Sequence, residues 1–137
     1  MTMRVVAVTG WSGSGKTTLL TETIAHLVAR GHRVAAMKHT HHPVNDDEAR
    51  GDTSRFRAAG ADPVVLASGN EAVFFRAAGT ETIPYGDPAE LVARINADIL
   101  LVEGFKERDD WPKLELSAPG RRTPEDVLAI LDRIEGS

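Results

Sequence analysis

Residues Gly10–Thr17 (GWSGSGKT) match the phosphate-binding pattern G-x-x-x-x-G-K-[ST] at every defined position. A β-branched apolar run precedes the loop and a helical pattern follows it, which is the context that phosphate binding requires. Glycines allow backbone N–H groups to converge on phosphate oxygens, and a helix N-terminus attracts anions. We expect Lys16 to neutralise the terminal phosphates and the Thr17 hydroxyl to ligate Mg²⁺. The alternative is a glycine-rich turn that carries a solvated lysine.

A second group on the metal side, after the Thr17 hydroxyl, is expected at the carboxyl end of another strand, where open α/β sheets bind ligands. Glu103 follows the apolar run Ile99–Val102 at such an end. Asp98 stands at the start of the same run, more than about 13 Å further from the phosphates. We therefore favour Glu103 as a water-mediated magnesium ligand or as the group that orients water. The alternative is a surface carboxylate beside a turn at Gly104.

The segment Lys38–His42 (KHTHH) follows a second short apolar run. We interpret it as the start of a polar loop that faces phosphate or a partner, with an ordinary solvated loop as the alternative. Three histidines raise the possibility of zinc, but the sequence has no cysteine and no H-E-x-x-H pattern to support a dedicated site. Asp52, just after this loop, could serve Mg²⁺ or cap a helix, and the two roles are compatible. Arg121–Arg122 is more typical of a solvated pair than of a phosphate finger.

Hydrophobic periodicity predicts the elements that position these residues. Apolar runs predict strands over Met3–Thr9, Arg33–Lys38, Asp62–Ala67, Glu71–Arg76, Ile99–Val102 and Lys113–Leu116. Helical patterns and caps predict helices over 16–30, 52–57, 87–95 and from Thr123 onward, the last with an apolar stripe of Val127, Ile130, Leu131 and Ile134. Strands that alternate with helices indicate a three-layer α/β domain with a mostly parallel sheet and an antiparallel edge.

Composition narrows the class of protein. The chain has 137 residues, of which 42% are apolar, and we predict one nucleotide-binding domain over residues 1–137. The absence of cysteine excludes disulfide scaffolds and thiol nucleophiles. A net charge of −4 argues against a nucleic-acid surface. The apolar run Val5–Val8 is too short for a signal peptide or a membrane span, so we expect a soluble cytoplasmic protein with no membrane partner.

Four segments in this order resemble the MobB family, adaptor proteins of molybdopterin-guanine dinucleotide biosynthesis. They are GWSGSGKTTLL (Gly10–Leu20), MKHTHH (Met37–His42), GDTSRFRAAGA (Gly51–Ala61) and DILLVEGFK (Asp98–Lys106). The following WPKLEL (Trp111–Leu116) also resembles the proline-lysine-led strand of that family. The phosphate loop is shared by many proteins, whereas its combination with KHTHH and LVEGFK is far more specific.

The resemblance implies a P-loop protein that binds GTP with Mg²⁺, hydrolyses it weakly, forms homodimers and assists a guanylyltransferase that joins GMP to molybdopterin. It implies that Lys38, His39 and the loop residues Gly10, Ser12, Gly13, Ser14, Gly15, Lys16, Thr17 and Thr18 contact the nucleotide. It also implies that Thr17, Asp52 and Glu103 surround Mg²⁺, and that Lys16, Asp52 and Glu103 carry any catalysis. Guanine preference comes only from the resemblance, because the N-K-x-D and D-x-x-G motifs are absent.

Two other function classes remain open at this stage. A small-molecule kinase of the nucleoside type shares the SGSGK loop, and Arg55 and Arg57 could form its lid, but little chain remains for an acceptor pocket. An interaction domain with an inactive nucleotide site conflicts with the intact Lys16–Thr17 pair. Short outer strands could pair with a second copy, which predicts a homodimer. The sequence leaves open whether molybdopterin itself contacts the chain.

Overall fold

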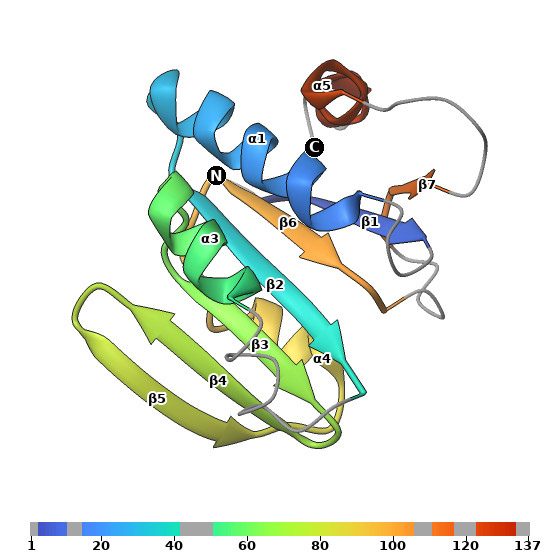
Figure 1. Cartoon of the computed structure of the whole chain (residues 1–137). Coiled ribbons are helices and arrows are strands. Elements are labelled where there is room, and N and C mark those ends of the chain that lie inside the picture. Colours follow the sequence, from blue (N-terminus) through green and yellow to red (C-terminus); the bar gives the residue numbers. More distant parts are fainter. Residues whose placement is uncertain (1–2, 11–14, 42–50, 106–110, 117–122, 134–137) are drawn as a thin grey trace.

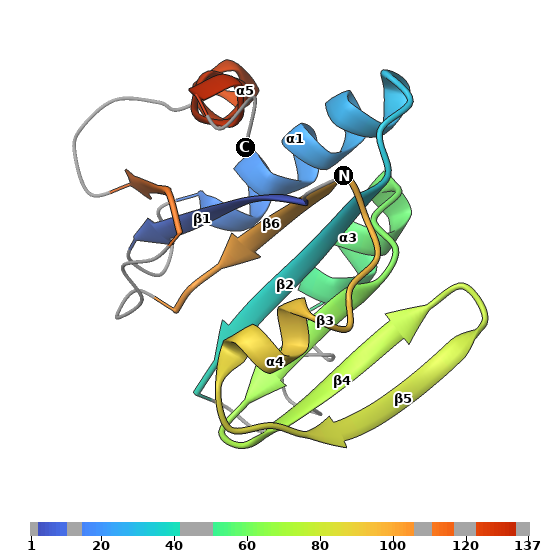
Figure 2. The same cartoon turned by 180° about the vertical axis from the view of Figure 1, so that it is seen from behind.

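The computed structural model describes residues 3–10, 15–41, 51–105, 111–116 and 123–133. In these ranges the elements follow the order β1 (Arg4–Gly10), α1 (Lys16–Ala29), β2 (Val34–Thr40), α3 (Asp52–Ala59), β3 (Val64–Ser68), β4 (Glu71–Arg76), β5 (Gly79–Pro84), α4 (Pro88–Val92), β6 (Ile99–Glu103), β7 (Lys113–Leu116) and α5 (Pro124–Arg133). The strands form one sheet in the order β5-β4-β3-β2-β6-β1-β7. Figure 1 shows α1, α3 and α5 on one face of this sheet, and the reverse view in Figure 2 shows α4 on the other.

Strand pairing confirms the predicted sheet type. Strands β3, β2, β6, β1 and β7 run parallel, whereas β4 and β5 add an antiparallel edge. The outer position predicted for the Lys113–Leu116 strand is also confirmed. Strand β5 was not predicted, because most of its residues are exposed and it lacks an apolar alternation. It is recognisable only through its antiparallel pairing with β4.

The central strands bury alternate side chains in two apolar layers. In β6, Ile99 and Leu101 join the layer beneath α1, α3 and α5, whereas Leu100 and Val102 join the layer on the α4 side. This alternation follows from the period of two of a strand, and burial on both faces explains the uninterrupted apolar run. The same alternation determines which face each polar residue occupies at the carboxyl end of the sheet.

The helices largely match the sequence prediction. Leu20, Ile24 and Leu27 of α1 are buried, and each contributes roughly 1.5–3 kcal/mol by leaving water. In α4 the capping box predicted for Asp87 and Glu90 is present, but the helix ends at Val92, so its predicted end at residue 95 was wrong.

Val127 and Leu131 of α5 are buried as predicted, while the side chain of Ile130 and residue 134 lie outside the described residues. The predicted loop over 42–50 and the pair at 121–122 lie outside them as well. Among the helices described, none is long and apolar enough to cross a membrane.

Candidate nucleotide and metal site

Two charged residues face each other where the carboxyl ends of β2 and β6 meet. Lys38 is the register partner of Glu103 in this parallel pair. Both residues are buried, Lys38 at 7% and Glu103 at 6% exposure. The pleat places them on the same face as Leu101, the face that α1 and α3 cover. This edge therefore holds a carboxylate and an ammonium beside the two helices.

Asp52 joins this pair from the start of α3. The Nζ of Lys38 donates a hydrogen bond to Asp52 Oδ2 at 2.5 Å. The residue that precedes α3 is Gly51, in a left-handed conformation at φ 82°, and the helix has no side-chain cap. The interpretation of Asp52 as a helix cap was therefore wrong, because its carboxylate bonds to the sheet edge instead.

Thr17, in the first turn of α1, connects the two carboxylates. Its Oγ1 donates to Glu103 Oε1 at 3.0 Å and lies 3.4 Å from Asp52 Oδ2. Just before it, Lys16 Nζ donates to the carbonyl of Gly10 at 2.7 Å and so connects the two ends of the loop. Three residues remote in sequence, Thr17, Asp52 and Glu103, thus bring oxygen atoms together at the N-terminus of α1.

The electrostatics of Glu103 reflect this environment. Burial raises the pKa of its carboxyl above the ordinary value, and the neighbouring Asp52 charge acts in the same direction. Lys38, the Thr17 hydrogen bond and Lys16 oppose that rise in the pKa. The net effect is a raised pKa of Glu103, and a cation added beside this carboxyl would oppose the rise and favour the ionised form.

The donor set fits magnesium. A hydroxyl and two carboxylates are hard oxygen ligands, and Mg²⁺ characteristically takes one or two carboxylates while water and phosphate oxygens complete its shell. Among the residues that the structure describes, no group of three or more His, Asp or Glu side chains converges.

The other predicted nucleotide contacts belong to the phosphate-binding loop and the start of α1. Residues Ser12, Gly13 and Ser14 lie outside the described ranges. Thr18 is exposed on α1, where Arg55 Nη2 donates to its Oγ1 at 3.4 Å, a contact that the sequence did not suggest. Gly15, at φ 94°, precedes α1 directly.

Asp98 lies at the amino end of β6, as its place in the sequence predicted. Its Oδ2 accepts a hydrogen bond of 2.9 Å from the backbone N–H of Arg33. That contact, with desolvation opposing it, holds the pKa of the carboxyl below the ordinary value. Asp98 therefore stabilises the end of the sheet that is remote from Thr17.

His39 does not join the carboxylates. Because β2 continues to Thr40, His39 points to the opposite face from Lys38, toward the α4 layer. Its ring stacks on Phe105 with centroids 4.3 Å apart and an interplanar angle of 12°. Trp111 meets Phe105 edge-on at 6.0 Å. The sequence reading missed this cluster, whose only signal was the Gly104–Phe105 pair that follows Glu103.

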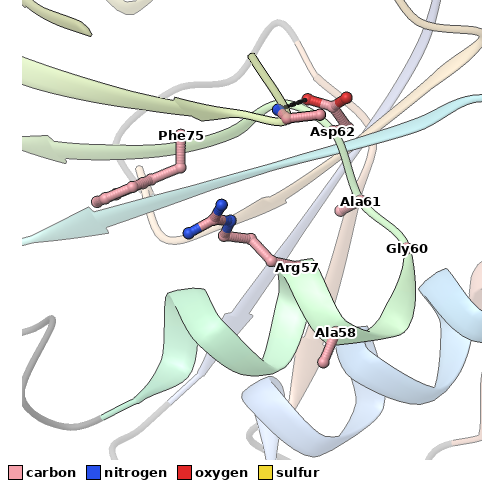
Figure 3. A pocket seen from close by; sticks show the side chains of 7 residues that line it. Arg57, Ala58, Gly60, Ala61, Asp62 and Phe75 are labelled. Atoms are coloured by element: carbon pink, nitrogen blue, oxygen red, sulfur yellow. Dashed lines mark hydrogen bonds between the residues drawn. The ribbon is translucent and has the colours of Figure 1, made fainter. Parts of the chain in front are cut away.

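A separate hollow of about 400 Å³ lies at the other end of α3. Figure 3 shows Arg57 reaching from the helix toward the ring of Phe75, and the guanidinium carbon lies 5.7 Å from the ring centroid. Asp62 accepts a hydrogen bond from the N–H of Ala77 at 3.3 Å on the far side. None of the predicted site residues lines this hollow.

Comparison with known proteins decides the family. Residues 5–133 match the family model described as molybdopterin guanine dinucleotide synthesis protein B, MobB. The match extends from β1 to α5 and includes all the residues that meet at Thr17. The chain belongs to the MobB family.

Individual relatives agree with this assignment. A molybdopterin-guanine dinucleotide biosynthesis adapter protein of Haemophilus influenzae is 36% identical over 92% of this chain and 72% of its own length. The adapter protein of Escherichia coli is 35% identical over 94% of this chain and 73% of its own. The crystal structure of Bacillus subtilis MobB superposes with a TM-score of 0.53 at 26% identity, covering 93% of this chain and 73% of that one. The family relationship supports the adapter reading and gives no support to a kinase.

Proposed function

We propose that this adapter binds GTP with Mg²⁺ at the N-terminus of α1, hydrolyses it slowly, and assists a guanylyltransferase in completing molybdopterin guanine dinucleotide. The observation that carries the proposal is the Thr17 hydroxyl, 3.0 Å from Glu103 and 3.4 Å from Asp52 at the end of the phosphate-binding motif. This arrangement pairs an anion-binding helix start with oxygen ligands for a divalent cation.

Each residue has a definite task in this proposal. Lys16 leaves the Gly10 carbonyl and neutralises the terminal phosphates, together with the loop residues 12–15 and Thr18. Thr17, Asp52 and Glu103 would hold Mg²⁺, which when bound neutralises phosphate charge. The Glu103 carboxylate orients a water molecule in a buried position. His39, on the opposite face, supports the end of β2 instead of contacting phosphate.

Guanine selectivity rests on the relatives. Their names specify molybdopterin-guanine dinucleotide biosynthesis, so a guanylyltransferase that uses GTP is the matching partner for this chain. The same proposal includes contact between molybdopterin and this chain, since molybdopterin would lie between the adapter and the guanylyltransferase.

We further propose that residues 1–137 form one nucleotide-binding domain that assembles as a cytoplasmic homodimer. Strand β5 pairs with β4 along one side only among the described strands, and Gly79–Thr82 are exposed. Such an edge presents backbone donors and acceptors to a second copy. Light scattering at micromolar concentration would then give twice the chain mass of 14.8 kDa, whereas 14.8 kDa would refute the dimer.

The function is tested by titrating fluorescent GDP and ADP analogues in the presence of Mg²⁺. We expect GDP to bind more tightly, and Lys16→Ala to abolish binding, because the phosphates lose their cation. Lys113→Ala, on the edge strand β7, removes the same charge elsewhere and should bind as the unmodified chain does. A preference for ADP would overturn the GTP assignment, and a turnover of tens per second by the isolated chain would overturn the adapter role.

A further inference from the structure

Lys38 places a basic side chain inside the proposed magnesium site. The residue is 7% exposed, so its ammonium is largely withdrawn from water. It donates to Asp52 and stands opposite Glu103 in the register of β2 and β6. A buried ammonium is retained only where carboxylates or other acceptors satisfy it, and here Asp52 accepts its hydrogen bond while Glu103 interacts with it electrostatically.

The Asp52 oxygen that Lys38 contacts is the one nearest to Thr17. Asp52 Oδ2 lies 2.5 Å from Lys38 Nζ and 3.4 Å from Thr17 Oγ1. Thr17 and Asp52 would hold a magnesium ion at the carboxylate that Lys38 already contacts. The ammonium and the metal would therefore compete for one carboxylate, and their charges would repel each other.

We propose that Lys38 is a positioning residue that keeps the two carboxylates assembled in the absence of metal and makes Mg²⁺ binding depend on the nucleotide phosphates. This inference rests on the proposed function. Without Lys38, the like charges of Asp52 and Glu103 would act on each other at this edge with one cation fewer to oppose them. With it, the bare site binds Mg²⁺ weakly, and the phosphates of a nucleotide supply the negative charge that restores affinity.

The order of events at the site follows from this balance. In the nucleotide-free chain, Lys38 holds Asp52, and through it the start of α3, against the sheet edge. Thr17, Asp52 and Glu103 would then hold Mg²⁺ together with the nucleotide and not before it. A metal-loaded empty site, which could attract any phosphate in the cell, is thereby disfavoured.

The experiment measures Mn²⁺ binding to the nucleotide-free protein by electron paramagnetic resonance. We expect Lys38→Met to bind Mn²⁺ at least about tenfold more tightly than the unmodified chain, because a unit charge within a few ångströms of the metal is removed. Lys38→Arg keeps the charge and should bind as weakly as the unmodified chain. The matched control Lys113→Met loses a lysine on β7 and should show no change.

A second variant keeps the proposal testable if the single change unfolds the edge. Lys38→Met combined with Asp52→Asn removes one charge of each sign and should return Mn²⁺ affinity to within about threefold of the unmodified chain. Equal Mn²⁺ affinity in the unmodified chain and Lys38→Met would overturn the proposal.

The proposed function fails by a different readout. If the unmodified chain binds no guanine nucleotide in the presence of Mg²⁺, the GTP assignment is wrong, while the Mn²⁺ measurement still reports on the charge of the empty site. If nucleotide binds and Lys38→Met leaves Mn²⁺ affinity unchanged, only the inference about Lys38 is wrong. A Lys38→Met protein that loses Mg²⁺-nucleotide binding without gaining Mn²⁺ affinity would instead make Lys38 a phosphate contact.

Discussion

Gly104 links the site to the strands that carry it, and its replacement by alanine should damage both stability and binding. The residue has φ 99°, a conformation that costs an L-residue about 1–2 kcal/mol. A Cβ at this position would lie 3.0 Å from the Cβ of His39 and 3.4 Å from its carbonyl oxygen. Neither atom is the end of a flexible chain, so overpacking adds about 1–3 kcal/mol. The expected total is about 2–5 kcal/mol of unfolding free energy.

A matched control separates the cost of the backbone conformation from the cost of overpacking. Gly31 has a similar φ of 91°, but a Cβ there meets nothing within 4 Å. Gly31→Ala should therefore lose only about 1–2 kcal/mol. Guanidinium chloride unfolding followed by circular dichroism measures both variants.

The binding effect follows from what Gly104 holds in place. Its N–H donates to the Val8 carbonyl at 3.2 Å, and Glu103 precedes it directly. A displaced chain at this point moves the Glu103 carboxylate relative to Thr17, so Mg²⁺-dependent nucleotide binding should weaken in Gly104→Ala and stay unchanged in Gly31→Ala. Equal stability losses in the two variants would refute the packing argument.

Three further changes probe charges and caps. Glu103→Gln should stabilise the nucleotide-free protein at neutral pH and weaken Mg²⁺-dependent nucleotide binding. Because burial raises the Glu103 pKa, the unmodified chain loses unfolding free energy as pH rises above the ordinary glutamate range. The stability difference between the variant and the unmodified chain should therefore vanish in unfolding curves recorded below that range. Asp98→Asn should destabilise at neutral pH without affecting nucleotide binding, and since the Asp98 pKa is lowered, the difference should disappear in acid unfolding as pH falls through that range. Asp87→Ala removes the α4 cap and should cost about 0.5–2 kcal/mol in chemical denaturation. If Glu103→Gln or Asp98→Asn leaves the pH dependence of stability unchanged, the pKa shift assigned to that carboxyl is contradicted. If Asp87→Ala is as stable as the unmodified chain, the role of Asp87 as a helix cap is contradicted.

The positions of the site residues were predictable wherever a general rule of α/β sheets applied. Glu103 was preferred over Asp98 because ligands gather at the carboxyl ends of strands, and the structure places the two residues at opposite ends of β6. The phosphate motif and its flanking strand and helix required only local pattern. Such features depend on neighbours in sequence and on sheet polarity.

Features that depend on tertiary contacts were not predictable. Asp52 was compatible with a cap, a site role or both, and only the tertiary structure shows that its carboxylate contacts Lys38, 14 residues away, and makes no cap hydrogen bond. His39 was predicted, like Lys38, to contact the nucleotide, and the extension of β2 to Thr40 places the two side chains on opposite faces of the sheet. Strand β5 carries so few buried side chains that its pairing with β4 left no apolar pattern to detect.

In the proposed site, the Thr17 hydroxyl anchors a metal that nucleotide binding needs. The most direct measurement compares the affinity for a fluorescent GDP analogue with and without Mg²⁺ in the unmodified chain and in Thr17→Val. Thr21→Val is the control, since Thr21 donates to the Thr17 carbonyl from one turn further along α1. We predict that Mg²⁺ tightens binding at least about tenfold in the unmodified chain and the control, and not at all in Thr17→Val. A full Mg²⁺ effect in Thr17→Val would contradict the account.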